Sequence, residues 1–245
     1  MKSEGLRKVS SDVISPGKIS PAKVSSGPRP RLRKGEGEHL RREILDATRD
    51  LLAEKGNLDL VSIRDIATRV GVSSPSIYLH FEDKDHLSYA VCREAFEGFA
   101  ARLLPIFSAE GNALERLQHL GAEYIHWGLD NAGLYPVLFV GSPPESIAFE
   151  EMAGDPGLLV LEGLVGLVRA GIEAGLISAD RTAEEIAWAM WAGVHGTVML
   201  LTSKMEWMQK HLEAAGSPVV VPTTEEMVAT VVGALFRAFS AISPG

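Results

Sequence analysis

The sequence predicts an all-α protein in which an N-terminal three-helix domain precedes a larger C-terminal helical domain. After residue 37, apolar residues recur at three- and four-residue spacings, which is the period of a helix with one buried face. Clusters of Gly, Pro, Asn and Asp separate these segments. Patterns typical of strands are essentially absent, and the valine run 219–221, which lies between two prolines, predicts an apolar loop. Together these features favour helices throughout.

Residues 1–37 predict a disordered, basic arm. They are rich in Ser, Pro, Gly and Lys, show no apolar period, and hold nine Lys/Arg against three Asp/Glu. Arg29, Arg31 and Arg33 alternate with other residues in a pattern that suits insertion into a narrow DNA minor groove. A solubilising tail is the alternative, and the residues leave both interpretations open.

Residues 38–87 predict three helices, the first over about 38–55. A second helix, Ile63–Val70, has Ser62 as a cap and ends at Gly71, which permits a sharp turn. A third short helix begins at Ser73 and Ser74, with a proline in its first turn. Ala67 is small where the second and third helices cross, and their predicted buried contacts are Ile66, Val70, Val72 and Ile77.

This arrangement is typical of a helix-turn-helix, which places one short helix in the DNA major groove. So short a helix cannot form its own core, and it is therefore expected to face outward. Base contacts are expected from the exposed first turns of the third helix, and backbone contacts from hydroxyl, imidazole and ammonium groups beside it. The candidates are Ser62, Ser73, Ser74, Pro75, Ser76, Tyr78, His80 and Lys84. A helical hairpin within a bundle is the alternative, and His80 has an alternative role in capping or packing.

Several of these residues also carry a family resemblance. They are Ile44-Leu45-Asp46-Ala47, Gly56, Ser62 to Ala67, Gly71-Val72-Ser73, and Ile77-Tyr78-Leu79-His80-Phe81 followed by Lys84. From about Leu40 to Leu87 the chain resembles the DNA-binding domain of the TetR family of transcriptional repressors. The resemblance implies similar roles for the candidates above and adds Arg64, which would reach a guanine through two hydrogen bonds. More weakly, the run Trp191-Ala192-Gly193-Val194-His195-Gly196 is similar to the tryptophan-histidine-glycine signature of one subgroup's C-terminal domain.

A linking helix is predicted from Asp83 to about Leu104, where Pro105 ends it. Further helices are expected at about 112–130, 134–140, 156–175, 181–207 and 223–241. The predicted organisation is a disordered arm over 1–37, a DNA-binding domain over 38–87, and a helical effector-binding and dimerisation domain over 88–245.

The net charge of −8 divides unevenly along the chain. The arm carries +6, residues 38–84 carry −2, and residues 85–245 carry −12. The acidic bulk is therefore expected to face away from DNA, which the arm approaches.

The single cysteine, Cys92, excludes an internal disulfide framework and predicts a buried thiol in a reducing cytoplasm. We expect no secretory signal and no membrane partner.

Catalysis is not expected, because the sequence lacks a glycine-rich phosphate loop, a nucleophile elbow and a zinc-protease motif. His119, Glu123 and His126 share one helical face, a geometry that suits a metal or acid–base site. That face lies opposite an apolar stripe, so a solvated polar face is favoured, and a metal-responsive regulator is kept as an alternative. No cofactor or resident metal is expected.

The helix at 181–207 is apolar almost all round, so it is expected to be buried on several sides. Ala189, Gly193 and Gly196 form a stripe small enough for close approach of a second helix. This helix and the last one, from each of two subunits, would form a symmetric four-helix interface in a homodimer. A monomeric core built from the same helices is the alternative.

Aromatic residues with polar tips suit the wall of a ligand cavity. The candidates are Tyr124, Trp127, Phe139, Trp188, Trp191 and His195. These stripes lack charge, so the expected ligand is apolar or weakly polar. The alternative is that the aromatic residues fill a core and that His195 is a core histidine whose hydrogen bonds are satisfied.

The resemblance implies a homodimeric repressor released from a palindromic double-stranded operator by a small-molecule effector. A non-specific architectural DNA-binding protein is the alternative.

Overall fold

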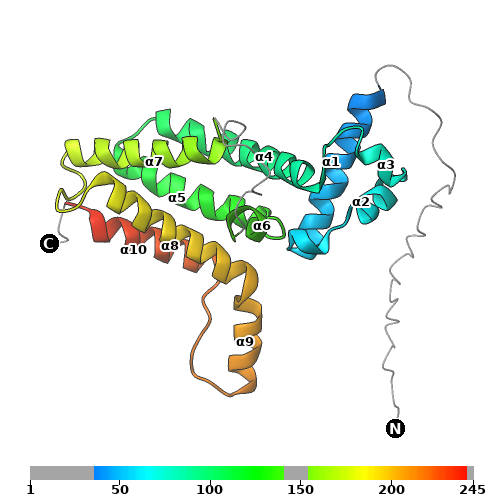
Figure 1. Ribbon diagram of the computed structural model, residues 1–245. Coiled ribbons are helices and arrows are strands. Elements are labelled where there is room, and N and C mark those ends of the chain that lie inside the picture. Colours follow the sequence, from blue (N-terminus) through cyan, green and yellow to red (C-terminus); the bar gives the residue numbers. More distant parts are fainter. Residues whose placement is uncertain (1–35, 141–153, 242–245) are drawn as a thin grey trace, which may run out of the picture.

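The computed structural model describes residues 36–140 and 154–241, and Figure 1 shows a small helical domain joined to a longer helical bundle. The predictions for Arg29, Arg31 and Arg33 lie outside the described residues. The small domain consists of α1 (Glu36–Lys55), a 3-10 turn (Leu58–Leu60), α2 (Ile63–Val70) and α3 (Ser74–Ile77). The helices predicted over this region are confirmed, and the all-α fold class with them.

The small domain is held by apolar side chains at the predicted helical spacing. Its core residues are Leu40, Ile44, Leu51, Leu52, Val61, Ile66, Ala67, Ile77 and Phe81. Of the four predicted contacts between α2 and α3, Ile66 and Ile77 are buried, while Val70 and Val72 are partly buried against the same core. The ammonium group of Lys55 at the end of α1 donates to the Leu60 carbonyl at 2.6 Å and to the Asp65 carboxylate at 3.0 Å, so α1 and α2 are also linked by polar contacts.

The link between the two domains is α4 (Lys84–Leu103), which contacts α1 at one end and α7 along its length. Asp83 begins this helix because its carboxylate accepts a hydrogen bond from the His86 backbone N–H at 2.8 Å. The helix ends beside Pro105 as expected, and a 3-10 helix (Leu104–Ser108) continues the chain. Cys92 on α4 is partly buried, and burial raises the pKa of its thiol to about 11, so it is an unreactive packing residue.

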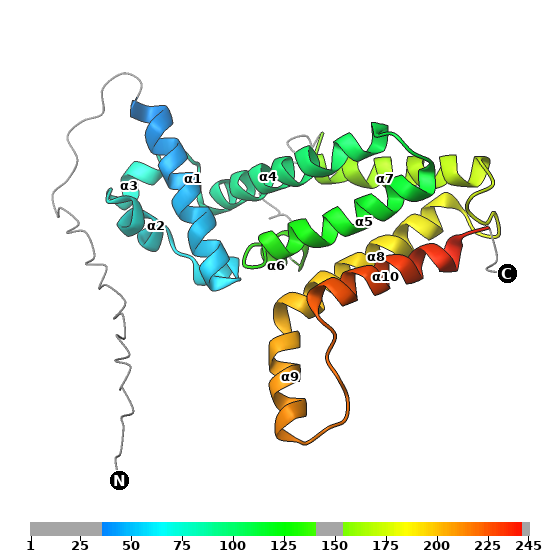
Figure 2. The same cartoon turned by 180° about the vertical axis from the view of Figure 1, so that it is seen from behind.

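The larger domain is a bundle of α5 (Ala113–Asp130), α6 (Tyr135–Val140), α7 (Pro156–Glu173), α8 (Ala183–Ser203) and α10 (Thr224–Phe239). Capping boxes begin α5, α8 and α10, with first residues Asn112, Thr182 and Thr223. Figure 2 shows α5, α8 and α10 running side by side, and α5 contacts both of the others. In the described part of the chain, α8 alone has the length and hydropathy of a membrane span; it contacts α5, α7 and α10, and 33% of its apolar stretch is buried.

One predicted helix boundary is wrong. The predicted helix over 181–207 ends at Ser203, and a separate helix, α9 (Met205–Ala214), follows Lys204. Lys204 has φ −127° and ψ −26°, which is outside the helical region, and α9 contributes no buried residue. Figure 1 shows α9 projecting away from the bundle. Helix ends are predicted from the spacing of apolar residues that pack against a core. No residue of α9 is buried, so this spacing does not indicate where α8 ends and α9 begins.

Candidate functional site

The turn between α2 and α3 has the geometry that its sequence predicts. The Ser62 side chain accepts from the Asp65 backbone N–H, and the Asp65 side chain accepts from the Ser62 N–H, each at 3.1 Å. At the other end of α2, Gly71 adopts φ 78°, a left-handed conformation that favours glycine. Hydrogen bonds from Lys55, above all, and from Ser62 lower the pKa of the Asp65 carboxyl to about 2, so this carboxylate stays charged at neutral pH.

The predicted DNA contacts lie at the start of α2, on α3 and between α3 and the start of α4, and we call these residues the reading face. Of the candidates, Ser62, Arg64, Ser73, Pro75 and Tyr78 are exposed, while Ser74, Ser76, His80 and Lys84 are half-buried. The Ser73 and Ser76 hydroxyls lie 2.8 Å apart and share one hydrogen bond. Ser62 uses its oxygen as an acceptor in the cap, so its hydroxyl hydrogen remains available to a phosphate oxygen.

Ion pairs divide the cations of the small domain into two groups. Arg69 makes two hydrogen bonds to Glu54, at 3.0 and 2.8 Å, and Lys55 is held by Asp65. Among the described residues, Arg64 and Lys84 have no ion-pair partner. These two side chains are therefore the free positive charges of the reading face, which fits contact with a base and with a phosphate.

One exposed residue of the reading face was missed by sequence reasoning. Leu79 is 82% exposed beside Tyr78, which is 52% exposed. An apolar side chain this exposed on a small domain is a candidate for contact with a thymine methyl or a sugar. Its exposure could have been inferred from its position in the sequence, because it directly follows Tyr78, a predicted DNA contact, and lies two residues after Ile77, a predicted buried residue.

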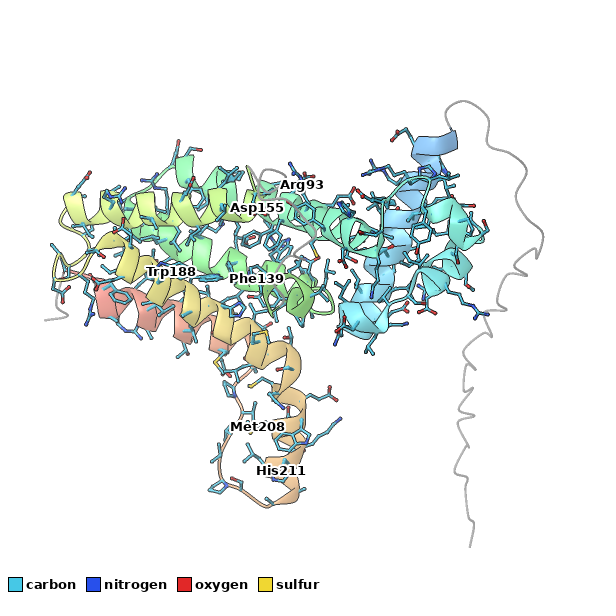
Figure 3. All side chains as sticks on the ribbon, viewed as in Figure 1. Arg93, Phe139, Asp155, Trp188, Met208 and His211 are labelled. Carbon is cyan, nitrogen blue, oxygen red and sulfur yellow. The ribbon has the colours of Figure 1, made fainter. Side chains whose placement is uncertain are left out.

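The larger domain contains a cavity of about 570 Å³ between α4, α5, α6, α7, α8 and α10. Within residues 36–140 and 154–241, the side chains that line it are almost entirely apolar or aromatic, and Asp155 is the one ionisable carboxyl among them. The aromatic members are Phe96, Phe99, Tyr124, Phe139, Trp188, Trp191 and Phe236. Figure 3 shows Phe139, Asp155 and Trp188 coming from different elements around this interior. A cavity of this size and composition suits an uncharged apolar molecule.

A chain of four hydrogen-bonded side chains runs from the cavity wall into the bundle, and we call it the relay. The Trp191 indole N–H donates to the Tyr124 hydroxyl at 3.0 Å. The Tyr124 and Tyr135 hydroxyls lie 2.9 Å apart, and the Tyr135 hydroxyl lies 2.7 Å from Nδ1 of His195. Burial raises the pKa of Tyr124 to about 12, raises that of Tyr135 further, and lowers the pKa of His195. All four groups are therefore uncharged near neutral pH.

Two family models match the chain in the parts where these features lie. The model of the bacterial regulatory proteins of the tetR family matches residues 44–91, which include the reading face. The model of the tetracyclin repressor-like C-terminal domain matches residues 117–211, which include much of the cavity wall. The chain belongs to the TetR family. As a member of a family of regulators, it is not an enzyme, in agreement with the expectation from sequence.

Individual relatives agree with this assignment. A curated relative of this TetR-family chain, the HTH-type transcriptional repressor KstR2 of Mycobacterium tuberculosis, is 35% identical over 86 residues, which are 35% of this chain and 42% of the relative. The match thus spans less than half the length of that relative. Among solved structures, FadR of Bacillus subtilis in complex with stearoyl-CoA has 17% identity and a TM-score of 0.61, covering 80% of this chain and 97% of that one. AibR in complex with isovaleryl coenzyme A and operator DNA has 18% identity and a TM-score of 0.61, covering 80% and 98%. At these identities the structures establish the shared fold.

In this TetR-family protein, four of the six predicted cavity residues line the cavity: Tyr124, Phe139, Trp188 and Trp191. The other two do not. Trp127 is buried with its ring centroid 4.9 Å from that of Phe99, so it supports the wall from behind. His195 lies one turn after Trp191 on α8, behind the lining residues Phe139 and Trp191, and its Nδ1 is hydrogen-bonded to Tyr135. On α8, therefore, Trp188 and Trp191 line the cavity and His195 does not.

The structure does not assemble a metal site from His119, Glu123 and His126. Glu123 accepts a hydrogen bond from Nε of Arg102 at 2.6 Å, and Arg102 also donates to Asp130 at 2.7 Å. His126 lies 3.8 Å from Glu123, and His119 is exposed. Across residues 36–140 and 154–241, no group of three or more His, Cys, Asp and Glu side chains is placed to hold a metal ion.

The two domains of this TetR-family protein touch at a point that sequence reasoning missed. Gly133 lies in the turn that joins α5 to α6, and a Cβ atom built on it would lie 2.3 Å from the carbonyl oxygen of Ala53 near the end of α1. Both TetR-family domains therefore meet through backbone atoms. On the other side of this turn, Leu138 and Phe139 of α6 line the cavity, so one short segment contacts both the cavity and the small domain.

Proposed function

We propose that this chain is a DNA-binding transcriptional repressor that acts as a homodimer and is released from a palindromic operator by a small apolar effector. The observation that carries the proposal is the combination of an outward reading face with an apolar cavity in the other domain. The names of the relatives support repression and control by an effector, since KstR2 is described as a repressor and FadR and AibR were solved with acyl-CoA molecules; the apolar lining of the cavity supports an apolar effector in this chain. The proposed place of action is the cytoplasm.

The mechanism is a shift between two conformers. Occupation of the cavity favours the conformer whose two reading faces no longer match successive major grooves. The segment from Gly133 to Phe139 and the long helix α4 are the two routes from cavity to reading face, because each contacts both domains. Coupling of this kind is reciprocal, so operator DNA lowers effector affinity by the same factor.

The proposed dimer interface uses the outer faces of α8 and α10. Ala189, Ala192 and Leu200 of α8 and Ala229 of α10 are exposed in the single chain. Gly193 is not available to a partner, since a Cβ there would lie 2.8 Å from Leu235 of the chain's own α10. Small residues of α8 therefore serve two contacts. Gly193 packs against α10 of the same subunit, and Ala189 and Ala192 face the proposed partner subunit.

A finer assignment concerns the C-terminal domain. We propose that it is similar to the tryptophan-histidine-glycine subgroup. The run Trp191 to Gly196 supports this, because Trp191 lines the cavity and His195 ends the relay.

Base reading and backbone positioning are separable by mutation. Arg64→Ala is expected to relax preference at particular base pairs by about 1–3 kcal/mol, and Ser76→Ala to relax it less. Lys84→Ala is expected to weaken binding equally on all sequences and to reduce the salt slope by about one. Fluorescence anisotropy on an operator and on single-base variants at three salt concentrations measures both effects. Wild-type affinity and preference in all three variants would contradict the reading face.

The basic arm is expected to add affinity without sequence preference. Removing residues 1–34 deletes nine Lys/Arg and two Asp/Glu, whereas the small domain itself is slightly acidic. The truncated protein should bind operator more weakly and with a smaller salt slope, with the fold and dimer retained. Circular dichroism and light scattering provide the controls. Unchanged affinity at physiological salt would show that the arm is a solubilising tail.

The cavity assignment predicts different effects on stability and on effector response. Trp191 is half-buried and lines the cavity, so Trp191→Ala should lower the free energy of unfolding by less than about 3 kcal/mol, the lower limit for a filled core. Release from the operator by an effector should be mostly lost. Urea unfolding and an operator-release titration measure the two quantities. A badly destabilised variant that is still released normally would show that Trp191 is a core residue.

A further inference from the structure

We propose that the effector presents an uncharged carbonyl oxygen to the hydroxyl of Tyr124, and that His195, which lies outside the cavity, is a positioning residue that orients this hydroxyl through its tautomer. This inference rests on the proposed function, because it specifies the ligand of the same cavity. It is carried by the geometry of the relay and by the lining of the cavity.

The relay has two complete hydrogen-bond arrangements. When the imidazole proton of His195 is on Nε2, Nδ1 accepts from Tyr135, and the Tyr135 oxygen accepts from Tyr124. The Tyr124 oxygen then accepts from Trp191, and its hydrogen is already used. When the proton is on Nδ1, every bond between His195 and Tyr124 reverses. The Tyr124 oxygen then accepts from both Tyr135 and Trp191, and its own hydrogen has no acceptor in the protein.

The two arrangements differ in what the cavity offers. A buried hydroxyl hydrogen without an acceptor is costly, so the empty cavity favours the proton on Nε2. A ligand carbonyl accepts the freed hydrogen of Tyr124 and removes that cost, so it favours the proton on Nδ1. The imidazole of His195 is half-buried, and its Nε2 has no hydrogen-bond partner among the described residues, which leaves that atom free to exchange its proton with water. Both tautomers are uncharged, so the exchange needs no change of net charge.

The cavity lining selects a neutral acceptor over other polar groups. The described lining residues include neither lysine nor arginine, and the one carboxyl among them, Asp155, disfavours an anionic ligand. Asp155 itself caps α7 by accepting from the Gly157 backbone N–H at 2.7 Å. A ligand hydroxyl is less favourable, because its own hydrogen needs an acceptor in the apolar cavity, whereas a carbonyl oxygen only accepts. A carbonyl on an apolar, flat body therefore fits best.

Flat aromatic probes test the ligand class directly, because the lining is largely aromatic. Pyrene has no oxygen, 1-acetylpyrene adds a carbonyl, and 1-hydroxypyrene adds a hydroxyl. Wild-type protein should bind 1-acetylpyrene about tenfold more tightly than pyrene, the effect of one hydrogen bond in a buried site. In Tyr124→Phe this ratio should fall to about one, while pyrene binding is retained. Tyr78→Phe, which removes a hydroxyl from the reading face, is the matched control and should keep the wild-type ratio.

The role of His195 has its own readout. In NMR spectra of protein labelled with ¹⁵N at histidine, the chemical shift of His195 Nδ1 should move from the unprotonated to the protonated range when 1-acetylpyrene binds. It should remain in the unprotonated range when pyrene binds. His195→Leu should lower the probe ratio to that of Tyr124→Phe. His195→Gln should restore it, because an amide both donates and accepts. An unchanged tautomer, or a normal ratio in His195→Leu, would overturn the positioning role.

The outcomes separate this inference from the function on which it rests. Equal binding of pyrene and 1-acetylpyrene by wild-type protein overturns the carbonyl assignment, and stronger binding of 1-hydroxypyrene replaces it with a hydroxyl ligand. If the wild-type protein prefers 1-acetylpyrene to pyrene, Tyr124→Phe does not, and neither probe releases operator DNA, the inference is supported and the effector mechanism is contradicted. If no probe binds, the cavity is not a ligand site, and both the inference and the effector mechanism fail, while the DNA-binding assignment stands.

Discussion

Gly133→Ala is expected to weaken operator binding strongly without changing a residue of the reading face or of the cavity. The new Cβ would lie 2.3 Å from the Ala53 oxygen, 2.9 Å from its carbonyl carbon and 3.0 Å from its Cα. These are backbone atoms of α1, so no side-chain rotation relieves the collision, and the small domain has to move relative to the bundle. Overpacking of this kind costs about 1–3 kcal/mol in stability. Operator titration, urea unfolding and probe binding to the cavity measure the separate effects.

Two other glycines provide matched controls for this substitution. Gly98 on α4 and Gly166 on α7 are exposed, and a Cβ on either would meet nothing within 4 Å. Each change to alanine should raise stability by up to about 1 kcal/mol, because alanine favours a helix interior, and should leave DNA binding unchanged. Normal operator affinity and normal effector release in Gly133→Ala would show that this contact does not transmit the signal.

Ile77→Ala is expected to abolish specific DNA binding. Ile77 is fully buried and is the one buried residue of the four-residue helix α3, so it alone anchors that helix to the domain core. Truncating a buried isoleucine costs about 2–5 kcal/mol, which is a large share of the stability of a small domain. The cavity is lined by residues of α4 to α8 and of α10 and by none of α3, so the bundle should still bind the pyrene probes. Operator titration and probe titration on the same sample measure the two results.

Leu79 is the matched control for Ile77, since it is two residues later and 82% exposed. Leu79→Ala should leave the unfolding transition unchanged. Retained operator specificity in Ile77→Ala would mean that α3 is held by its backbone contacts and that the side chain is not its anchor.

The sequence was most informative where a residue type is demanded by local geometry. Gly71 in a left-handed turn, the Ser62 cap and the proline in the first turn of α3 each follow from backbone requirements, so the helix-turn-helix could be predicted residue by residue. The clusters of Gly, Pro, Asn and Asp between the apolar segments also placed the starts of α5, α8 and α10 to within about two residues, an accuracy usual for helix ends.

Contacts between elements distant in sequence could not be predicted in this way. Nothing near Gly133 indicates that Ala53 lies against it, because the contact depends on how α4 orients the two domains. The exclusion of Trp127 and His195 from the cavity lining depends likewise on which side of α5 and of α8 faces the cavity. The same limit applies to α9, whose composition resembles that of a packed helix although none of its residues is buried.

The projection of α9 has a consequence for the covalent continuity of the chain. Residues 205–222 contribute no buried side chain, whereas α10 packs against α5 and α8 and its end is fixed by hydrogen bonds from Ser178 to Phe239 and from Ala241 to Leu176. A cut within 215–222 would therefore leave α10 attached to the bundle without a peptide link. The protein could then be made as two fragments that reassemble, with new termini or an inserted reporter domain at this tip.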